Sequence, residues 1–311
     1  MTENRESLLS IRDFGVSFQR YDSRMGQTRL QVISNLHLTV YPGEILAVVG
    51  SSGSGKSLLA LAILGMLPLN AVTGGEILYR GKGLTPERQK QLRGKKIALV
   101  PQSVTFLDPL MKTGKQADGQ GGTGLTQKRR DIFRRLGLPG KTENLYPFQL
   151  SGGMARRVLV STALLTEAEL ILADEPTPGM SLEQALEALR MFREMAEEGR
   201  AVLLITHDLD LAVDFADRVA VFYAGTTVET ARASDFQNGP DALRHPYSRA
   251  LWESLPQNGF RPVNGFQPYA GNLPGGCPYA SRCPLRTARC ETALPPVRTV
   301  RGGEVRCYDG A

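Results

Sequence analysis

Glycines, a lysine and a hydroxyl residue follow one another closely near residue 50, in an arrangement that can hold phosphate. Residues 50–57 read Gly-Ser-Ser-Gly-Ser-Gly-Lys-Ser and match the pattern G-x-x-x-x-G-K-[ST] without a mismatch. The glycines let successive backbone N–H groups point at a β-phosphate, Lys56 adds positive charge, and the Ser57 hydroxyl can bind Mg²⁺. The sequence therefore predicts nucleotide binding by this loop, whose residues are Gly50, Ser51, Ser52, Gly53, Ser54, Gly55, Lys56 and Ser57.

A second run able to hold phosphate lies further along the chain. Residues 150–154 read Leu-Ser-Gly-Gly-Met and open a predicted helix. Ser151, Gly152 and Gly153 would therefore present a hydroxyl and backbone N–H groups at a helix N-terminus, where anions bind. One chain with two phosphate-binding segments predicts a nucleotide enclosed between two chains.

An acidic pair ends a strand-like run in the second half of the sequence. Residues 168–173 are mostly apolar and are followed by Asp174 and Glu175. The carboxyl ends of parallel strands are where an open α/β sheet binds its ligand, so we expect Asp174 to hold Mg²⁺ and Glu175 to act as general base on the attacking water. The alternative is an acidic turn exposed to solvent before Pro176.

Two further polar residues follow other strand-like runs. His207 comes after residues 201–206 and could hydrogen-bond a γ-phosphate, although a single histidine at a strand end is more often structural. Gln102 comes after residues 97–101 and offers a neutral side chain that can orient water or contact the metal. With Glu175, these two residues form the predicted catalytic set.

Strands and helices are predicted in the order that this chemistry requires. Residues 44–49 form an apolar run typical of a buried strand, and residues 58–64 form one typical of a buried helix. The loop between them thus joins a strand to a helix, as the motif demands. A glycine-rich turn between two core elements is the competing interpretation. Residues 8–49 are rich in predicted strand and are interrupted by a turn at residues 22–27.

These motifs together resemble the ATP-binding cassette (ABC) ATPases, the motor subunits of ABC transporters. Over residues 8–235 five motifs follow in the family's order: Walker A, the Q-loop glutamine, the signature at 150–154, Walker B with its acidic pair, and the switch histidine. The resemblance implies an α/β fold with a P-loop ABC-type ATPase core, an antiparallel β subdomain and a short helical subdomain.

The same resemblance implies ATP and Mg²⁺ as ligands and a head-to-tail dimer in which each ATP lies between one chain's Walker A and the other's signature. The nucleotide-binding domain is expected at residues 1–235, with its helical subdomain at 103–150. The resemblance also implies an aromatic side chain stacked on adenine, for which Phe18 and Tyr21 are candidates. An ordinary strand aromatic is the alternative for either residue.

The segment after Walker B departs from the family pattern. Residues 176–181 read Pro-Thr-Pro-Gly-Met-Ser, so Ser181 stands where the family usually has the aspartate of its D-loop. That loop normally crosses the dimer interface. The departure therefore predicts pairing with a second, different ATPase chain and two unequal ATP sites, with a catalytically degenerate regulatory ATPase as the alternative.

The insert before the signature also differs from the expected pattern. Residues 114–124 contain five glycines and are predicted to form a flexible loop instead of a helix. Only residues 126–136 are predicted to be helical, which predicts a trimmed subdomain. The basic clusters at 128–130 and 134–135 are interpreted as a solvated helix face.

All four cysteines lie beyond residue 235, where the composition shifts toward proline, glycine and arginine. The reducing cytosol disfavours disulfides, so clustered cysteines favour a metal site. Their spacing lacks the Cys-x-x-Cys pairs of structural zinc, and four thiolates on a loop-rich segment suit a [4Fe–4S] cluster. Zinc and free or disulfide-bonded thiols are the alternatives for this set, which comprises Cys277, Cys283, Cys290 and Cys307.

Residues 236–311 form the predicted C-terminal extension. Its His245-Pro246-Tyr247 run predicts a helix start with Pro246 in the first helical position. With Tyr-Pro-Phe at 146–148, the extension resembles that of the peptide and nickel importer ATPases, some of which hold an iron–sulfur cluster. This resemblance implies import of peptides or of nickel or metal-chelate complexes. It also implies a different second ATPase chain, two membrane permease subunits and an extracytoplasmic substrate-binding protein.

Composition agrees with an ATPase at the cytoplasmic face of the membrane. The 311 residues are 41% hydrophobic, enough for a sizeable core, yet no apolar run approaches the roughly 20 residues that span a bilayer. The polar first seven residues contain no signal-peptide core. A net charge of +6 is modest, and no nucleic-acid partner is expected. A soluble ABC ATPase of DNA repair or translation is kept as the alternative.

Overall fold

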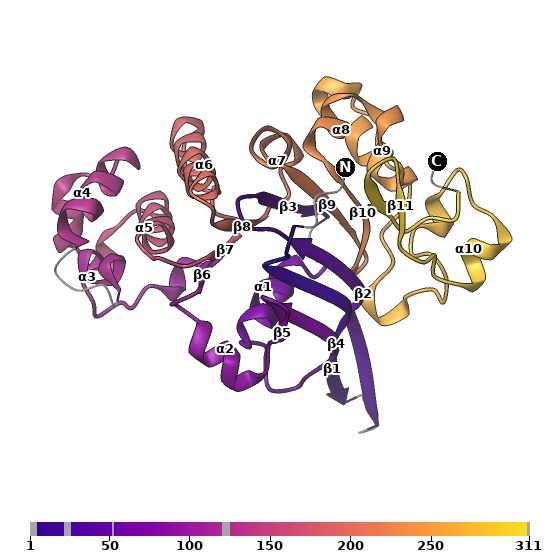
Figure 1. The fold of residues 1–311 in the computed structure, drawn as a ribbon, viewed down its shortest axis with the longest axis horizontal. Coiled ribbons are helices and arrows are strands. Elements are labelled where there is room, and N and C mark those ends of the chain that lie inside the picture. Colours follow the sequence, from indigo (N-terminus) through magenta and orange to yellow (C-terminus); the bar gives the residue numbers. More distant parts are fainter. Residues whose placement is uncertain (1–4, 22–25, 52, 120–124, 310–311) are drawn as a thin grey trace.

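The chain folds around two β-sheets in a computed structural model that describes residues 5–21, 26–51, 53–119 and 125–309 (Figure 1). The larger sheet has the strand order β11-β12-β10-β9-β3-β8-β7-β6, and the smaller has the order β2-β1-β4-β5. The antiparallel pairs within the smaller sheet confirm the predicted β subdomain.

The central strands of the larger sheet run parallel and are mostly apolar. Such runs are expected where helices cover both faces of a sheet. The strands predicted before Lys56, Glu175 and His207 are all present, with ends that shift by two residues or fewer. The strands of this sheet are β3 (Ile45–Gly50), β6 (Ile97–Val100), β7 (Leu170–Asp174), β8 (Ala201–Ile205), β9 (Arg218–Tyr223), β10 (Thr226–Arg232), β11 (Arg298–Val300) and β12 (Gly303–Val305).

The smaller sheet packs over α1 (Lys56–Leu64), because its apolar residues and those of α1 share one hydrophobic core with β3, β7 and β8. This core holds the strand before the phosphate loop and the helix after it. The strands are β1 (Leu9–Tyr21), β2 (Gln27–Val40), β4 (Ala71–Tyr79) and β5 (Lys82–Gly83), and α2 (Pro86–Leu92) follows them.

A second core joins the other face of the larger sheet to the helices drawn at the left of Figure 1. The long amphipathic helix α6 buries its alanines, methionines and Phe192 there. The elements of this region are η1 (Val104–Phe106), α3 (Thr113–Asp118), α4 (Thr126–Arg135), η3 (Gly140–Asn144), η4 (Pro147–Gln149), α5 (Gly152–Leu164), α6 (Leu182–Glu197) and α7 (Leu209–Phe215).

The prediction of a glycine-rich loop at 114–124 is wrong for its first half, because α3 is helical through Asp118. A Cβ on Gly114 would lie 2.8 Å from the carbonyl oxygen of Glu143, so close packing overrides the low helix propensity of glycine. Residues 120–124 lie outside the described chain. The subdomain thus contains one more helix than predicted, and it is less trimmed than the sequence suggests.

The prediction that the basic cluster at 128–130 forms a solvated helix face is wrong for Arg129. Arg129 is buried, and its guanidinium forms ion pairs with Asp118 and Glu143. Arg130 and Arg134 are exposed, as expected. A buried arginine with two carboxylate partners holds α4 against α3 and η3.

The C-terminal extension shares a third core with the cassette. Apolar residues of β9, β10 and α7 pack with residues of α8, α9 and the cysteine-containing segment. The hairpin β11-β12 adds to the larger sheet beside β10. The helices are α8 (Ala233–Gln237), α9 (Pro246–Glu253) and α10 (Ala288–Thr292), with η5 (Pro240–Ala242), η6 (Pro256–Asn258), η7 (Ala270–Asn272) and η8 (Ala280–Arg282) between them.

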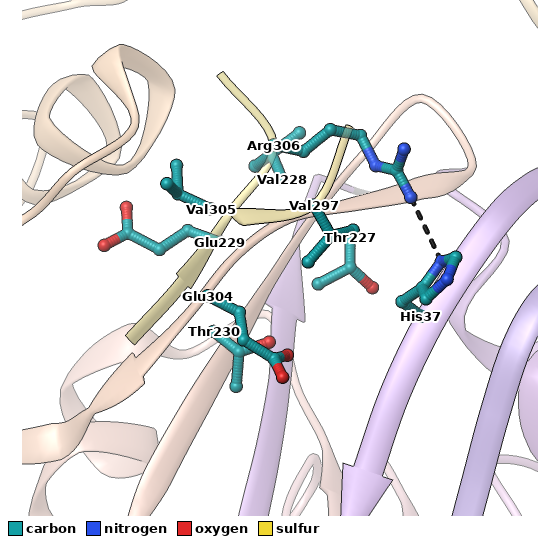
Figure 2. A pocket seen from close by; sticks show the side chains of 9 residues that line it. All are labelled: His37, Thr227, Val228, Glu229, Thr230, Val297, Glu304, Val305 and Arg306. Carbon is teal, nitrogen blue, oxygen red and sulfur yellow. Dashed lines mark hydrogen bonds between the residues drawn. The ribbon is translucent and has the colours of Figure 1, made fainter. Parts of the chain in front are cut away.

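The end of the extension also crosses to the smaller sheet. Arg306 follows β12 and donates to Nδ1 of His37 on β2 at 3.1 Å (Figure 2). It also donates to the carbonyl oxygen of Asn35 at 2.8 Å. The extension is therefore attached to both sheets. Within the described residues, no helix is long and apolar enough to cross a membrane.

Candidate nucleotide-hydrolysis site

The phosphate loop leaves β3 at Gly50. Any other residue at this position would displace β9. A Cβ on Gly50 would lie 2.3 Å from the carbonyl oxygen of Phe222. Gly55 has a φ of 95° and caps α1 in the left-handed conformation, which favours glycine. Lys56, the first residue of α1, donates from Nζ to the carbonyl oxygens of Gly50 and Ser51, each at 2.9 Å. Burial lowers the pKa of Lys56, while the nearby Glu175 and Asp174 raise it.

Oxygen ligands from three separate elements meet beside this lysine. Ser57 Oγ donates to Asp174 Oδ1 at 3.1 Å and lies 3.5 Å from Gln102 Oε1. Burial raises the pKa of Asp174, and the hydrogen bond from Ser57 opposes that rise. Hydroxyl, carboxylate and amide oxygens are the hard donors that Mg²⁺ prefers, so the donor set fits the predicted metal.

The predicted general base is held by the predicted switch histidine. Glu175 Oε1 lies 2.8 Å from Nδ1 of His207, and the Glu175 N–H donates to the carbonyl oxygen of Ile205. Glu175 has a φ of 48°, a conformation that non-glycine residues retain mainly where the surroundings enforce it. Its Oε2 is buried and has no hydrogen-bond partner in the described part of the chain.

Several of these side chains border one cavity of about 280 Å³ beside the loop. The predicted residues that line it are Gly53, Gly55, Lys56, Ser57, Gln102 and Glu175, joined by Val32 and Leu58. Asp174 and His207 join the same group through their hydrogen bonds to Ser57 and Glu175. Ser52 lies outside the described residues.

The signature segment occupies a different place from this cavity. Ser151 caps α5 and accepts a hydrogen bond from the N–H of Met154, so the predicted helix start is confirmed. A Cβ on Gly153 would lie 2.5 Å from the carbonyl oxygen of Gly179, which requires glycine where the signature meets the D-loop. Ser151 and Gly152 are exposed and do not border the cavity.

Phe18 stays a prediction as an adenine contact. It lies on β1, is half-buried and packs against the core shared by α1 and the smaller sheet. It is not among the residues that line the cavity. Tyr21 ends β1, and its side chain lies outside the described part of the structure.

Ser181 begins a helix in the structure. Its hydroxyl accepts from the N–H of Gln184, whose side chain accepts in return from the N–H of Ser181. This capping box satisfies two donors at the start of α6. The exposed serine thus has a local role that is independent of any partner chain.

Sequence reasoning missed Arg156, which follows the signature on α5. Its guanidinium donates to the carbonyl oxygens of Pro101, at 2.9 Å, and of Gln102. Burial lowers its pKa, and Asp174 and Glu175 oppose that change. Arg156 therefore connects the signature helix to the Q-loop. Its position in the sequence, beside Arg157, gives no signal for this contact.

The four cysteines are free thiols that lie in the extension. Cys277, Cys290 and Cys307 are buried, and Cys283 is half-buried. Burial raises the pKa of Cys277 to about 11, and the charges of the other three cysteines act in the same direction. The Cys277 N–H donates to the Cys290 carbonyl oxygen at 2.8 Å, yet no group of three His, Cys, Asp or Glu side chains in the described chain is arranged to hold a metal ion.

The fold and the grouped side chains define a P-loop nucleoside-triphosphate hydrolase of the cassette class. Two family models match the sequence: ABC transporter over residues 33–178, and oligopeptide/dipeptide transporter, C-terminal region, over residues 228–290. The dipeptide transport ATP-binding protein DppD of Bacillus subtilis is 34% identical over 97% of this chain and 95% of its own. The oligopeptide transport ATP-binding protein OppD of Salmonella typhimurium is 32% identical over 97% and 93%.

The chain belongs to the family of ABC transporter ATP-binding proteins, and it is an ATPase coupled to transport. A solved ATP-binding cassette, in a dimeric post-hydrolysis state bound to ADP and Pi, has the same fold. It superposes with a TM-score of 0.62 at 24% identity, over 72% of this chain and 98% of the other. The predicted fold class and family are thereby confirmed.

Proposed function

We propose that this chain is the ATP-hydrolysing subunit of a peptide importer, bound peripherally at the cytoplasmic face of the membrane. The family match at residues 228–290 and the names of both relatives support peptides as the cargo. The same comparisons favour peptides over the nickel and metal-chelate complexes that the sequence also predicted.

The proposed residue roles follow from the geometry of the cavity. The loop N–H groups and Lys56 bind the ATP phosphates, while Ser57, Asp174 and Gln102 would hold Mg²⁺. The metal would neutralise charge on the β- and γ-phosphates. Glu175 accepts the proton of the attacking water, and His207 holds that carboxylate in place and contacts the γ-phosphate.

The observation that carries this proposal is the position of the Glu175 carboxylate. One oxygen is fixed by His207 at 2.8 Å, and the other is buried without a partner in the described chain. Leaving a buried carboxylate oxygen unpaired is costly. A water molecule placed for attack on the γ-phosphate would satisfy it.

We also propose that two ATPase chains close on each ATP. The exposed signature residues Ser151 and Gly152 lie outside their own chain's cavity, so they are free to meet a nucleotide held by another chain. Ser181 in the D-loop favours a partner that is a different ATPase chain, acting with two permease subunits and a substrate-binding protein. ATPase rates of this chain alone and with a candidate partner test the pairing, and full cooperative activity alone would contradict it.

The four cysteines are proposed as a metal site, with a [4Fe–4S] cluster ahead of zinc. Their thiols and burial suit a cluster chemically, and a backbone hydrogen bond of 2.8 Å from Cys277 to Cys290 keeps two of the four close together. In the described chain the four thiols are not arranged to hold a metal ion. The proposed steps of ATP hydrolysis do not use these thiols. Anaerobic purification followed by an absorption spectrum and iron, sulfide and zinc analysis tests this proposal. Anaerobically purified protein that contains neither iron nor zinc would contradict it.

Uptake assays in cells that lack this chain test the proposed cargo. Radiolabelled dipeptide and radiolabelled nickel are supplied separately, and the chain is restored either as wild type or as Lys56→Ala. We expect dipeptide uptake to return with the wild type alone. Restored nickel uptake would replace the peptide proposal. Copurification with nucleic acid or ribosomes instead of membrane proteins would favour the soluble ATPase alternative.

A further inference from the structure

The C-terminal extension reaches the phosphate loop at Ser51. The Ser51 hydroxyl donates to Oε1 of Gln267, which lies between α9 and the cysteine-containing segment. The Tyr247 phenol also lies beside Ser51: burial raises the pKa of Tyr247, and the nearby Ser51 side chain and backbone oppose that rise. Two residues far along the chain thus hold one residue of the loop.

Ser51 is also bonded to the lysine of the loop. Its carbonyl oxygen accepts from Lys56 Nζ at 2.9 Å. On its other side the loop begins at Gly50, which is packed against the backbone of Phe222. Ser51 is therefore the connection between Lys56 and the extension, beside a loop end that cannot move toward β9.

The Tyr247 ring is held in a rigid aromatic group. Its centroid lies 4.4 Å from that of Tyr223, at the end of β9, and 5.3 Å from that of Tyr279. Tyr247 follows Pro246 in the first turn of α9, and its N–H donates to Nδ1 of His245 at 3.0 Å. Both the backbone and the ring of Tyr247 are fixed, so its hydroxyl has a defined position toward Ser51.

The segment that carries Gln267 is tied to the same aromatic group. Arg282 donates to the Tyr223 hydroxyl at 3.0 Å and to the carbonyl oxygens of Val263 and Asn264 at 2.9 and 2.7 Å. One arginine thus holds the chain shortly before Gln267 and contacts the ring group that fixes Tyr247. Both contacts to Ser51 depend on this arrangement.

We propose that Tyr247 and Gln267 are positioning residues for ATP binding, which act on Lys56 through Ser51. The inference rests on the proposed ATP-binding role of the loop. The extension holds Ser51 and thereby sets the direction of the loop. It also sets the position of Lys56 before the lysine exchanges its two carbonyl partners for the phosphates. Neither residue contacts the groups that activate water, so they act on nucleotide affinity and not on the hydrolytic step.

The test measures nucleotide affinity and turnover separately on the full chain. Gln267→Ala removes the hydrogen bond to Ser51, and Tyr247→Phe removes the phenol hydroxyl beside Ser51 while keeping the buried ring. Titration with the fluorescent analogue MANT-ATP should show binding weakened about three- to tenfold for each, the effect of losing one or two hydrogen bonds. KM for ATP should rise by the same factor, while kcat at saturating ATP stays within about twofold.

Two reference variants separate the possible failures. Tyr269→Phe removes a phenol from the same segment that contacts Arg20 instead of the loop, and it should bind MANT-ATP as the wild type does. Lys56→Ala should abolish tight binding. Wild-type binding by Lys56→Ala would overturn the proposed function. Lost binding in Lys56→Ala beside wild-type binding in Gln267→Ala and Tyr247→Phe would overturn only the positioning role.

A double-mutant cycle identifies the route of the effect. Ser51→Ala removes the hydroxyl that bonds Gln267, so Gln267→Ala should have no further effect on KM in that background. Additive effects of the two changes would contradict a route through Ser51. A fall in kcat equal to the rise in KM would also overturn the assignment, because it would place these residues in hydrolysis.

Discussion

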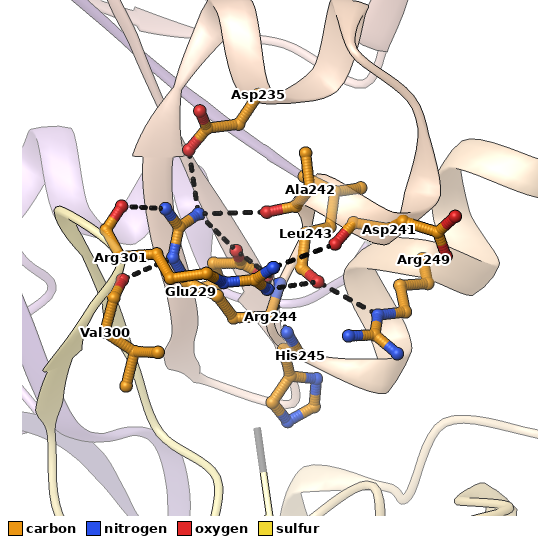
Figure 3. Close-up of polar contacts among 10 residues, drawn as sticks. All are labelled: Glu229, Asp235, Asp241, Ala242, Leu243, Arg244, His245, Arg249, Val300 and Arg301. Carbon is orange, nitrogen blue, oxygen red and sulfur yellow. Dashed lines mark hydrogen bonds and ion pairs between the residues drawn. The ribbon is translucent and has the colours of Figure 1, made fainter. Parts of the chain in front are cut away.

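The phosphate-loop edge of the larger sheet and the start of the C-terminal extension both bury charged groups, but they pair them differently. At the loop, Glu175 Oε2 and Ser54 Oγ are buried without a hydrogen-bond partner in the described chain. In the extension, Arg244 is 2% exposed and bonds to Glu229, which is fully buried, and to Asp235 (Figure 3). Arg244 also donates to the carbonyl oxygens of Val300 and Arg301 at 2.6 Å.

This difference separates a site that needs a ligand from a network that holds the fold. An unpaired buried polar group costs free energy and is retained where a ligand can satisfy it. A fully paired network in a low-dielectric interior instead fixes its members in one arrangement. Glu229 also accepts from the N–H groups of Arg244 and His245, so this network positions the helix start that presents Tyr247 to the loop.

The largest effect is expected from Glu175→Gln, which breaks the ligand-dependent region alone. The amide cannot accept the proton of water, so the ATPase rate should fall about 10²- to 10⁴-fold, the usual contribution of a general base. MANT-ATP binding should be retained, because Lys56 and the loop are unchanged. Phosphate-release kinetics measure the rate.

The matched control for this variant is Glu169→Gln, at the opposite end of β7. Glu169 pairs with Arg80 and Lys96 and lies away from the loop cavity, so hydrolysis should stay near the wild-type rate. Equal losses in both variants would mean that Glu175 acts through the fold and not as the base.

The second-largest effect is a loss of stability, expected when a substitution breaks the paired network around Arg244. Arg244→Met leaves Glu229 buried with one partner fewer, which should lower the free energy of unfolding by about 3–5 kcal/mol. The exposed ion pairs of Arg135 with Glu187 and Glu194 provide the control, and Arg135→Met should cost about 1 kcal/mol or less. Urea unfolding followed by circular dichroism measures both, and equal losses would remove the distinction between the two regions.

The same contrast explains what the sequence could predict. The loop chemistry is local: strand β3, the glycines, Lys56 and Ser57 follow one another in a motif that dictates its own geometry. The parallel strands then bring Asp174 and Glu175 to the same sheet edge. Short-range pattern and sheet topology therefore predicted most of the site.

The remaining contacts depend on packing between distant segments, which no local pattern encodes. Helix α3 forms although Gly114 disfavours it, because Gly114 packs against Glu143. Arg156 and Gln267 reach Gln102 and Ser51 across the fold. Long polar side chains of this kind are usually exposed, so their sequence context gave no reason to expect these bonds.

A third prediction concerns the reactivity of the buried thiols in the extension. Burial raises the pKa of Cys277 from an ordinary 9.0 to about 11, so its thiolate fraction at pH 8 falls about a hundredfold. Iodoacetamide should therefore modify Cys277 at least that much more slowly in folded, metal-free protein than in urea. Peptide mass spectrometry follows the rate, and equal rates in both states would contradict the buried, neutral thiol.

The smallest effect is a pH dependence that arises in the paired region. Burial lowers the pKa of His245 to about 3, with a smaller effect from Arg249. Below about pH 6.5 the unfolded chain binds a proton at this residue that the folded chain does not, so stability is lost as the pH falls from 6.5 toward 3. The loss from this one group amounts to at most about 1.4 kcal/mol per pH unit.

His245→Asn isolates this contribution, because asparagine can still cap α9 by accepting from the Tyr247 N–H but does not titrate. The variant should be less stable than the wild type at pH 7, where the packing of the His245 ring against Tyr279 is lost. The difference in unfolding free energy should then shrink as the pH falls toward 5. The other two histidines are present in both proteins, so the comparison isolates His245. A difference that stays constant with pH would show that His245 is not held neutral by the fold.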